Sequence, residues 1–129
     1  MHKLFLIVAS ISSAITVALG AFGAHTLKRY VSADLLNTFE TGVRYQFYHS
    51  MALFIVAILF EKYNSKYTVY AGNSFILGII LFSGSLYLLT FLNSTENIGI
   101  RKIGIITPFG GLFFILGWLS LAWSVYKKT

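Results

Sequence analysis

The chain has no cysteine and few charged residues, and both absences limit what it can be. Charged residues make up only 11% of the 129-residue sequence, against about a quarter in ordinary soluble domains. There is therefore too little polar side chain to cover a water-soluble globule. Without cysteine, the chain can form no disulfide, thiolate nucleophile or cysteine-ligated iron–sulfur cluster.

Negative charge is also scarce, since ten Lys and Arg residues face only four Asp and Glu residues, for a net charge of +6. The basic residues form no run and stand at the ends of apolar stretches, a pattern typical of anchoring at a membrane surface. Nucleic-acid binding therefore has no support. The chain also lacks GxGxxG, P-loop and HExxH motifs, so no nucleotide or zinc-protease site is indicated.

Apolar residues are abundant, at 57% of the chain, and they fall into four long stretches. We place these at about residues 4–24, 43–60, 69–92 and 107–126. At about 1.5 Å per residue, each can cross or nearly cross a hydrocarbon core of about 30 Å. The sequence predicts an all-α, four-transmembrane-helix antiparallel bundle, with residues 1–129 as a single membrane domain because the linkers are short.

The first stretch also resembles a signal peptide, because a basic start precedes an apolar run that ends in small residues. Small residues recur along it at helical spacing, which is typical of a helix that another helix approaches closely. They are Ser10, Ala14, Ala18 and Ala21. We interpret the stretch as a transmembrane helix whose small residues pack against a neighbouring helix.

The second helix is expected to begin before the membrane, with an interfacial extension. Ser32 is a good N-cap and Asp34 suits the first turn, so the helix should run from about residue 32 to about Glu61. Where it enters the membrane, it carries polar residues that are costly near lipid. Together with the end of the first helix they form a candidate polar patch: His25, Glu40, Arg44, Tyr45, Gln46 and His49.

Helical spacing predicts two contacts within this patch. Glu40 and Arg44 are four residues apart, in the favourable order for an ion pair, and Tyr45 and His49 are also four apart. We expect His49 to point at another helix and to have a polar partner there. The candidate partners are His25, Tyr87, Asn93 and Thr107.

Three roles are open for the patch. The favoured role is structural, with paired polar groups that fix how the helices pack. A histidine beside a carboxylate can instead shuttle protons or bind a quinone or lipid headgroup, with Arg44 available for an anionic headgroup. The third role is to hold a haem between two histidines, or a divalent metal between His25, Glu40 and His49. We expect no metal and no cofactor.

The third and fourth stretches carry hydroxyl and small residues for helix packing. Hydroxyls at membrane depth need an acceptor, most simply a helix carbonyl one turn back or a neighbouring helix. Thr107 and Pro108 resemble an N-cap and a first helical position, so the fourth helix should start there. The residues expected to pack or hydrogen bond are Gly78, Ser83, Gly84, Ser85, Tyr87, Thr107, Gly110 and Gly111.

The basic residues leave the orientation of the bundle open, because five lie at the end with both termini and five at the other end. Acidic residues that include Glu96 partly neutralise the second group, so we expect both termini in the cytoplasm. Trp118, Trp123 and Tyr126 are expected to approach the membrane surface.

Four motifs, in order across nearly the whole chain, resemble those of a known family. They are Gly20-Ala-Phe-Gly-Ala-His25, Phe39-Glu-Thr-Gly-Val-Arg-Tyr-Gln-Phe-Tyr-His49, Leu81-Phe-Ser-Gly-Ser-Leu-Tyr87 and Ile106-Thr-Pro-Phe-Gly-Gly111. The family is domain of unknown function 423, the UPF0382-type small four-helix membrane proteins, which in animals look like transmembrane protein 256. The resemblance implies a four-span protein of the bacterial plasma membrane and implies no substrate, cofactor or catalytic residue.

We therefore expect a multi-pass, non-enzymatic membrane protein that contacts membrane lipids and associates with itself or with another membrane protein. The alternative is a lipid-, quinone- or small-solute-binding protein, or a transporter, that uses the polar patch. Four spans leave little room for alternating access, so transport would require an oligomer. An enzyme is expected least, because the sequence offers no evident nucleophile–base pair.

Overall fold

The computed structural model describes residues 1–94 and 100–128, and this part of the chain is helical with no strand. Glu96, which enters the orientation argument, lies outside the described residues. The elements are α1 (Lys3–His25), the 3₁₀ turn η1 (Leu27–Arg29), α2 (Ala33–Leu59), α3 (Lys66–Gly78), the π-helical segment η2 (Ile79–Ser83), α4 (Gly84–Ser94), α5 (Ile100–Gly104) and α6 (Ile106–Lys128).

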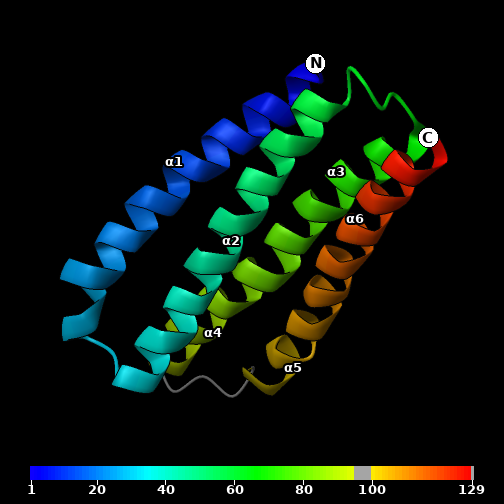
Figure 1. Cartoon of the computed structure of the whole chain (residues 1–129). Helices are drawn as coiled ribbons and strands as arrows, with labels where there is room; N and C mark the ends of the chain where they lie inside the picture. Colours follow the sequence, from blue (N-terminus) through cyan, green and yellow to red (C-terminus); the bar gives the residue numbers. More distant parts are fainter. Residues whose placement is uncertain (95–99, 129) are drawn as a thin grey trace.

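The described residues form four long helical units. They lie side by side, and successive units run in opposite directions (Figure 1). α3, η2 and α4 together make one of these units, and α2 lies between it and α1. The backbone N–H of His2 donates to the carbonyl of Ala57 at 3.0 Å, which joins the start of α1 to the end of α2. The hydroxyls of Thr68 and Ser124, 2.9 Å apart, join the start of α3 to the end of α6.

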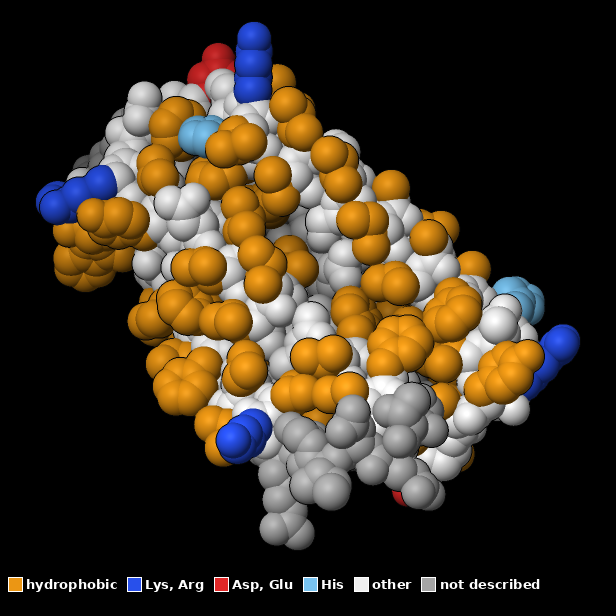
Figure 2. Space-filling view, turned by 180° about the vertical axis from the view of Figure 1, so that it is seen from behind, with side chains coloured by type: hydrophobic (Ala, Val, Ile, Leu, Met, Phe, Trp, Pro, Cys, Tyr) orange, Lys and Arg blue, Asp and Glu red, His pale blue; other side chains and the backbone are white. Residues whose placement is uncertain are grey.

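Three of these units are long and apolar enough to cross a membrane: residues 3–29, 66–93 and 102–127. α2 does not meet the same criterion among the described residues. Large hydrophobic side chains are exposed on all four units, and they cover most of the face in Figure 2, with basic side chains toward its edges. Such a surface is unsuited to water, so the chain is a membrane protein with transmembrane helices.

The interior is unusually polar for a protein with so apolar a surface. Among the described residues, ten polar or charged side chains are buried beside thirteen hydrophobic ones. A soluble domain places most of its polar side chains outside. A large buried polar share is expected when the surrounding solvent is lipid, because polar groups then need partners inside the protein.

The start of α2 agrees with the sequence-based prediction, whereas the start of α6 does not. Ser32 caps α2, since its Oγ accepts a hydrogen bond from the N–H of Leu35 at 3.3 Å. α6 begins at Ile106, so the expected N-cap at Thr107 is wrong. Pro108 is the third residue of α6 and still lies in the first turn, where its missing N–H removes no intrahelical bond.

Glycines allow the close approach of α6 to the third helical unit. A Cβ atom added at Gly110 would collide with the backbone of Phe82, and one added at Gly78 would collide with the ring of Phe114. Gly111 is less crowded, because a Cβ atom added there would lie 3.8 Å from the Phe82 ring, an ordinary contact distance. Nothing lies within 4 Å of the corresponding position at Gly84, so the close packing expected there is a wrong prediction.

The small residues of α1 do not pack as expected. Ser10, Ala14, Ala18 and Ala21 are exposed, and α1 instead buries a different stripe. The buried residues are Phe5, Ala9, Ser12, Thr16 and Gly23. The prediction that the first set contacts another helix of the same chain is therefore wrong.

Candidate functional site

The candidate polar patch divides into separate parts. His25 is the last residue of α1 and is exposed. Glu40 and Arg44 lie on the partly exposed side of α2, whereas Gln46 and His49 are buried. The six residues therefore do not converge on one cavity.

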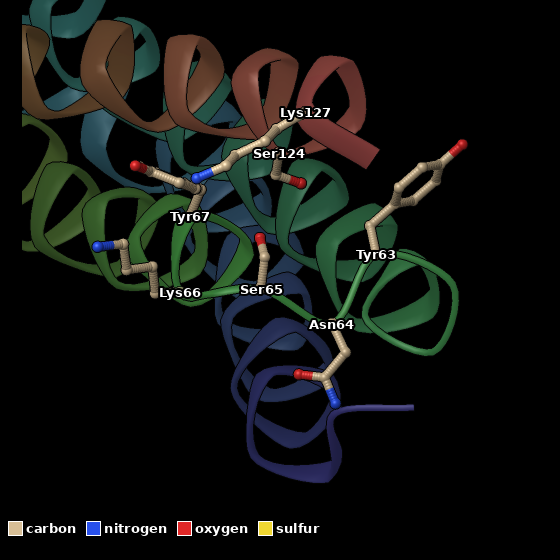
Figure 3. Close-up of a pocket in the computed structure, with 7 residues that line it drawn as sticks. All are labelled: Tyr63, Asn64, Ser65, Lys66, Tyr67, Ser124 and Lys127. Carbon is tan, nitrogen blue, oxygen red and sulfur yellow. The ribbon is translucent and has the colours of Figure 1, made fainter. Parts of the chain in front are cut away.

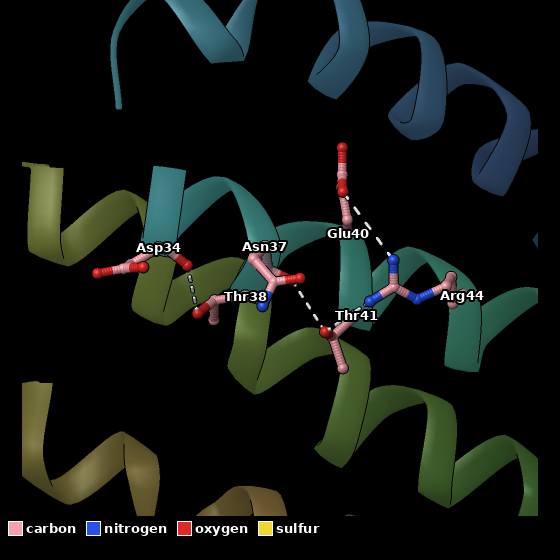
Figure 4. Close-up of polar contacts among 6 residues, drawn as sticks. All are labelled: Asp34, Asn37, Thr38, Glu40, Thr41 and Arg44. Atoms are coloured by element: carbon pink, nitrogen blue, oxygen red, sulfur yellow. Dashed lines mark hydrogen bonds and ion pairs between the residues drawn. The ribbon is translucent and has the colours of Figure 1, made fainter. Parts of the chain in front are cut away.

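The charged part is an ion pair on the surface of α2 (Figure 4). Arg44 Nη1 lies 4.0 Å from Glu40 Oε2, and the two side chains are 48% and 46% exposed. Arg44 Nη2 also donates to Thr41 Oγ1 at 3.1 Å, and the Thr41 hydroxyl donates to the carbonyl of Asn37 at 2.9 Å. These contacts stay within neighbouring turns of one helix, so they organise the local surface of α2 and join it to no other helix.

Gln46 connects three helices through its side-chain amide. Nε2 donates to the carbonyl oxygen of Ser12 in α1 at 3.2 Å, and Oε1 accepts from the hydroxyl of Tyr87 in α4 at 2.7 Å. The hydroxyl of Ser50 lies 2.7 Å from both Ser12 Oγ and the carbonyl oxygen of Gln46. Both ends of the Gln46 amide are thus occupied by protein groups.

His49 is held from two sides. Its Nδ1 lies 2.7 Å from the carbonyl oxygen of Tyr45, and its Nε2 accepts a hydrogen bond from Trp118 Nε1–H at 3.2 Å. Because a carbonyl only accepts and an indole only donates, the two bonds require the neutral tautomer with the proton on Nδ1. The ring also stacks on Phe114, with centroids 3.4 Å apart and an angle of 8° between planes.

The partner of His49 differs from the sequence-based expectation. Trp118 lies in α6 and was expected only near the membrane surface. None of the four expected partners makes the bond: His25, Tyr87, Asn93 and Thr107. Sequence spacing could identify the contact with Tyr45 one turn away, but no pattern marks Trp118 as a donor across the fold.

Hydroxyls on the third helical unit bond to the neighbouring helices. Ser83 donates to the carbonyl of Gly42 in α2 at 2.7 Å. Ser85 donates to the carbonyl of Phe82 at 2.8 Å, and its oxygen lies 2.6 Å from Thr107 Oγ1 in α6. These bonds join α2 and α6 to opposite sides of the same unit, so their evident role is to hold helices together.

One groove lies beside the patch, between α2 and α6. Its volume is about 630 Å³, and its walls include Tyr45, Phe82, Leu112 and Trp118. His49 also lines it, but both ring nitrogens are already bonded within the protein. Among the described residues, no three His, Asp or Glu side chains gather as metal ligands would. The groove therefore offers mainly aromatic and aliphatic surface.

Comparisons with known proteins agree with the family resemblance. The sequence profile of a family described as "Protein of unknown function (DUF423)" matches residues 19–111. This chain belongs to the DUF423 family. The matched segment includes all six patch residues, the whole of α2 and the start of α6.

Relatives share nearly the full length of this DUF423 protein. The UPF0382 membrane protein YwdK of Bacillus subtilis is 41% identical over 126 residues, covering 97% of this chain and 98% of that protein. The UPF0382 membrane protein of Haemophilus influenzae is 39% identical, covering 99% and 98%. The UPF0382 inner membrane protein YgdD of Escherichia coli is 37% identical, covering 98% and 92%. No solved structure matches the chain.

Proposed function

We propose that this protein is a four-span, non-enzymatic protein of the bacterial plasma membrane with a structural or accessory role. In this role it associates with copies of itself or with another membrane protein. The observation that carries the proposal is the exposed stripe of small residues on α1, which no helix of the same chain covers among the described residues.

The path of the chain supports α2 as the fourth span. α1 and α3 run in the same direction, and α2 returns between them (Figure 1). If α1 and α3 each cross the bilayer from the same side, α2 must cross it in reverse. The hydropathy of α2 is lower because the helix carries more polar residues, and three of these, Gln46, His49 and Ser50, are buried away from the lipid. Its outward face carries apolar side chains such as Ile55 and Ile58.

The exposed stripe of α1 has the properties of a helix–helix contact. In lipid, apolar burial contributes little to helix association, so close backbone approach between small residues and interhelical bonds become important. Ser10, Ala14, Ala18 and Ala21 follow helical spacing on one side of α1. α1 lies at the outer edge of the fold in Figure 1, where a second molecule can reach it.

Cysteine crosslinking in native membranes tests the proposal cleanly, because the chain has no cysteine of its own. In a two-fold symmetric contact centred on this stripe, a residue at the middle of the stripe lies near the axis and meets its own copy. Ala14→Cys should therefore form a disulfide-linked dimer, or a crosslink to one recurring partner. The matched control is Ile115→Cys, which places an exposed thiol on α6. Only monomer from Ala14→Cys, or equal crosslinking at both positions, would contradict the proposal.

The groove between α2 and α6 favours a second candidate, a lipid-, quinone- or small-solute-binding protein or transporter. Its volume of about 630 Å³ and its aromatic walls suit a flat apolar ligand. Leu112→Trp fills this groove from an exposed position. The candidate predicts that a small molecule co-purifying with the wild type, detected by mass spectrometry, is lost in this variant. An unchanged set of bound molecules would exclude it.

A further inference from the structure

A second pocket lies at the end of the molecule that holds both termini, away from the polar patch. Its volume is about 380 Å³, and it lies between the start of α3 and the end of α6 (Figure 3). The residues that matter for its chemistry are Ser65, Lys66, Tyr67, Ser124 and Lys127. The pocket therefore combines the two lysine ammonium groups with the hydroxyls of Ser65 and Ser124 and with tyrosine rings, that of Tyr67 among them.

The two lysines of this pocket share one aromatic ring. Nζ of Lys66 and Nζ of Lys127 each lie 5.4 Å from the ring centroid of Tyr67. Neither ammonium has a carboxylate within ion-pair distance among the described residues, where the ion pairs are Met1–Glu61 and Glu40–Arg44. Two like charges beside one ring repel each other, so an anion between them is favourable.

The start of α3 adds positive potential of the same sign. Ser65 is the N-cap of this 13-residue helix, and its Oγ accepts from the N–H of Thr68 at 3.3 Å. The other N–H groups of a first turn have no acceptor within their own helix, which makes a helix start attractive to anions. The N-cap Ser65 and both lysines line the same pocket, so the helix start adds to the positive potential of the two ammonium groups there.

The position of the pocket relative to the membrane indicates which anion it meets. Lys66 begins one candidate span and Lys127 ends another that runs in the opposite direction. Both ammonium groups therefore lie at the same membrane surface. Tyr67, Trp123 and Tyr126 form a chain of rings there, with centroid distances of 6.5 and 5.6 Å. Such aromatic belts mark the depth of lipid headgroups.

We propose that this pocket binds the phosphate of an anionic phospholipid headgroup. The phosphate lies between the ammonium groups of Lys66 and Lys127, near the first turn of α3, and the acyl chains follow the apolar outer face of α3 and α6. Phosphatidylglycerol is the appropriate probe because it adds a net negative charge at this depth, whereas phosphatidylcholine carries no net charge.

The test compares two double variants of the full-length protein in vesicles of phosphatidylcholine that contain a trace of spin-labelled phosphatidylglycerol. Lys66→Gln with Lys127→Gln removes the two charges of the pocket. Lys3→Gln with Lys62→Gln is the control, because it removes two charges from the same end of the molecule outside the pocket. The wild type and the control should bind labelled phosphatidylglycerol in preference to labelled phosphatidylcholine, and the pocket variant should bind it about tenfold more weakly.

Four outcomes would overturn this proposal. A wild type with no preference for phosphatidylglycerol has no such site. Equal losses in the two double variants would show a general attraction to surface charge. Complete displacement of the labelled lipid by millimolar inorganic phosphate would show a site for a soluble anion. Lys66→Arg with Lys127→Arg keeps both charges and should retain the preference, whereas its loss would also contradict the proposal.

Discussion

The helices of this protein are joined in two different ways. α2 meets α1 and α4 through hydrogen bonds, with the Gln46 amide between the Ser12 carbonyl and the Tyr87 hydroxyl. The third helical unit meets α6 through the Thr68–Ser124 and Ser85–Thr107 hydroxyl contacts. Between them the two units fit closely, and Gly78 leaves space for the Phe114 ring. The centre of the first contact depends on the donors and acceptors of the Gln46 amide, whereas the second depends also on the absence of a side chain at Gly78.

The difference shows how a membrane protein replaces the hydrophobic effect between its helices. Lipid tails are as apolar as leucine, so helix association must come from van der Waals fit or from interhelical hydrogen bonds. A fitted contact fails when atoms are added, because packed backbones cannot move apart cheaply. A hydrogen-bonded contact fails by smaller steps, because each bond in a membrane contributes only about 0.6 kcal/mol on average.

Gly110→Ala should have the largest effect of the substitutions considered. The added Cβ would collide with the backbone of Phe82, and backbone cannot yield as a side chain can. We expect a loss of about 3 kcal/mol in the free energy of unfolding, measured in detergent. Gly84→Ala is the matched control, because its Cβ meets nothing within 4 Å. Equal effects at the two glycines would refute the fitted contact.

Gly78→Ala should cost less, about 2 kcal/mol, because the colliding atoms belong to the Phe114 side chain. Phe114→Leu in the same molecule makes room for the new methyl group. The double variant should therefore be more stable than the sum of the two single effects predicts, which a double-mutant cycle measures. Strict additivity would show that the two side chains do not share this space.

Gln46→Leu should weaken the hydrogen-bonded contact by about 1 kcal/mol, because it leaves the Ser12 carbonyl and the Tyr87 hydroxyl with fewer partners. Asn73→Leu makes the matching amide-to-leucine change at an exposed site of α3. It should leave thermal unfolding unchanged. If Asn73→Leu lowered the melting temperature as much as Gln46→Leu, the interhelical role of Gln46 would be wrong.

Glu40→Gln should have the smallest effect, below about 0.5 kcal/mol, because both members of its ion pair with Arg44 are about half exposed and belong to the same helix. The melting temperature in detergent at low ionic strength should hardly change. A large loss of stability would show that this pair joins helices, as the buried polar groups do.

Local sequence chemistry predicted some of this fold well. The lengths of the apolar stretches predicted four spans, and three of the helical units are long and apolar enough to cross a membrane. The cap at Ser32 follows from residue type alone. Contacts one helical turn apart were also predictable, such as the Glu40–Arg44 ion pair. These features depend only on residues close together in the chain.

Contacts between helices were not predictable in the same way. In lipid, both faces of a helix can be apolar, so hydropathy does not tell the inner face from the outer one. This is why the small residues of α1 at Ala14 and Ala18 were assigned to the inside although they are exposed. The bond between His49 and Trp118 joins residues 69 positions apart, and no spacing rule applies to such a pair.

We propose that the buried polar residues of α2 hold helices together and do not bind a ligand. His49→Leu tests it most directly, with Tyr48→Leu as an exposed control on the same helix. Melting temperature and co-purifying small molecules are measured for both variants and for the wild type. The account predicts a lower melting temperature for His49→Leu alone, with an unchanged set of bound molecules. An unchanged melting temperature together with the loss of a bound lipid, quinone or haem would contradict it.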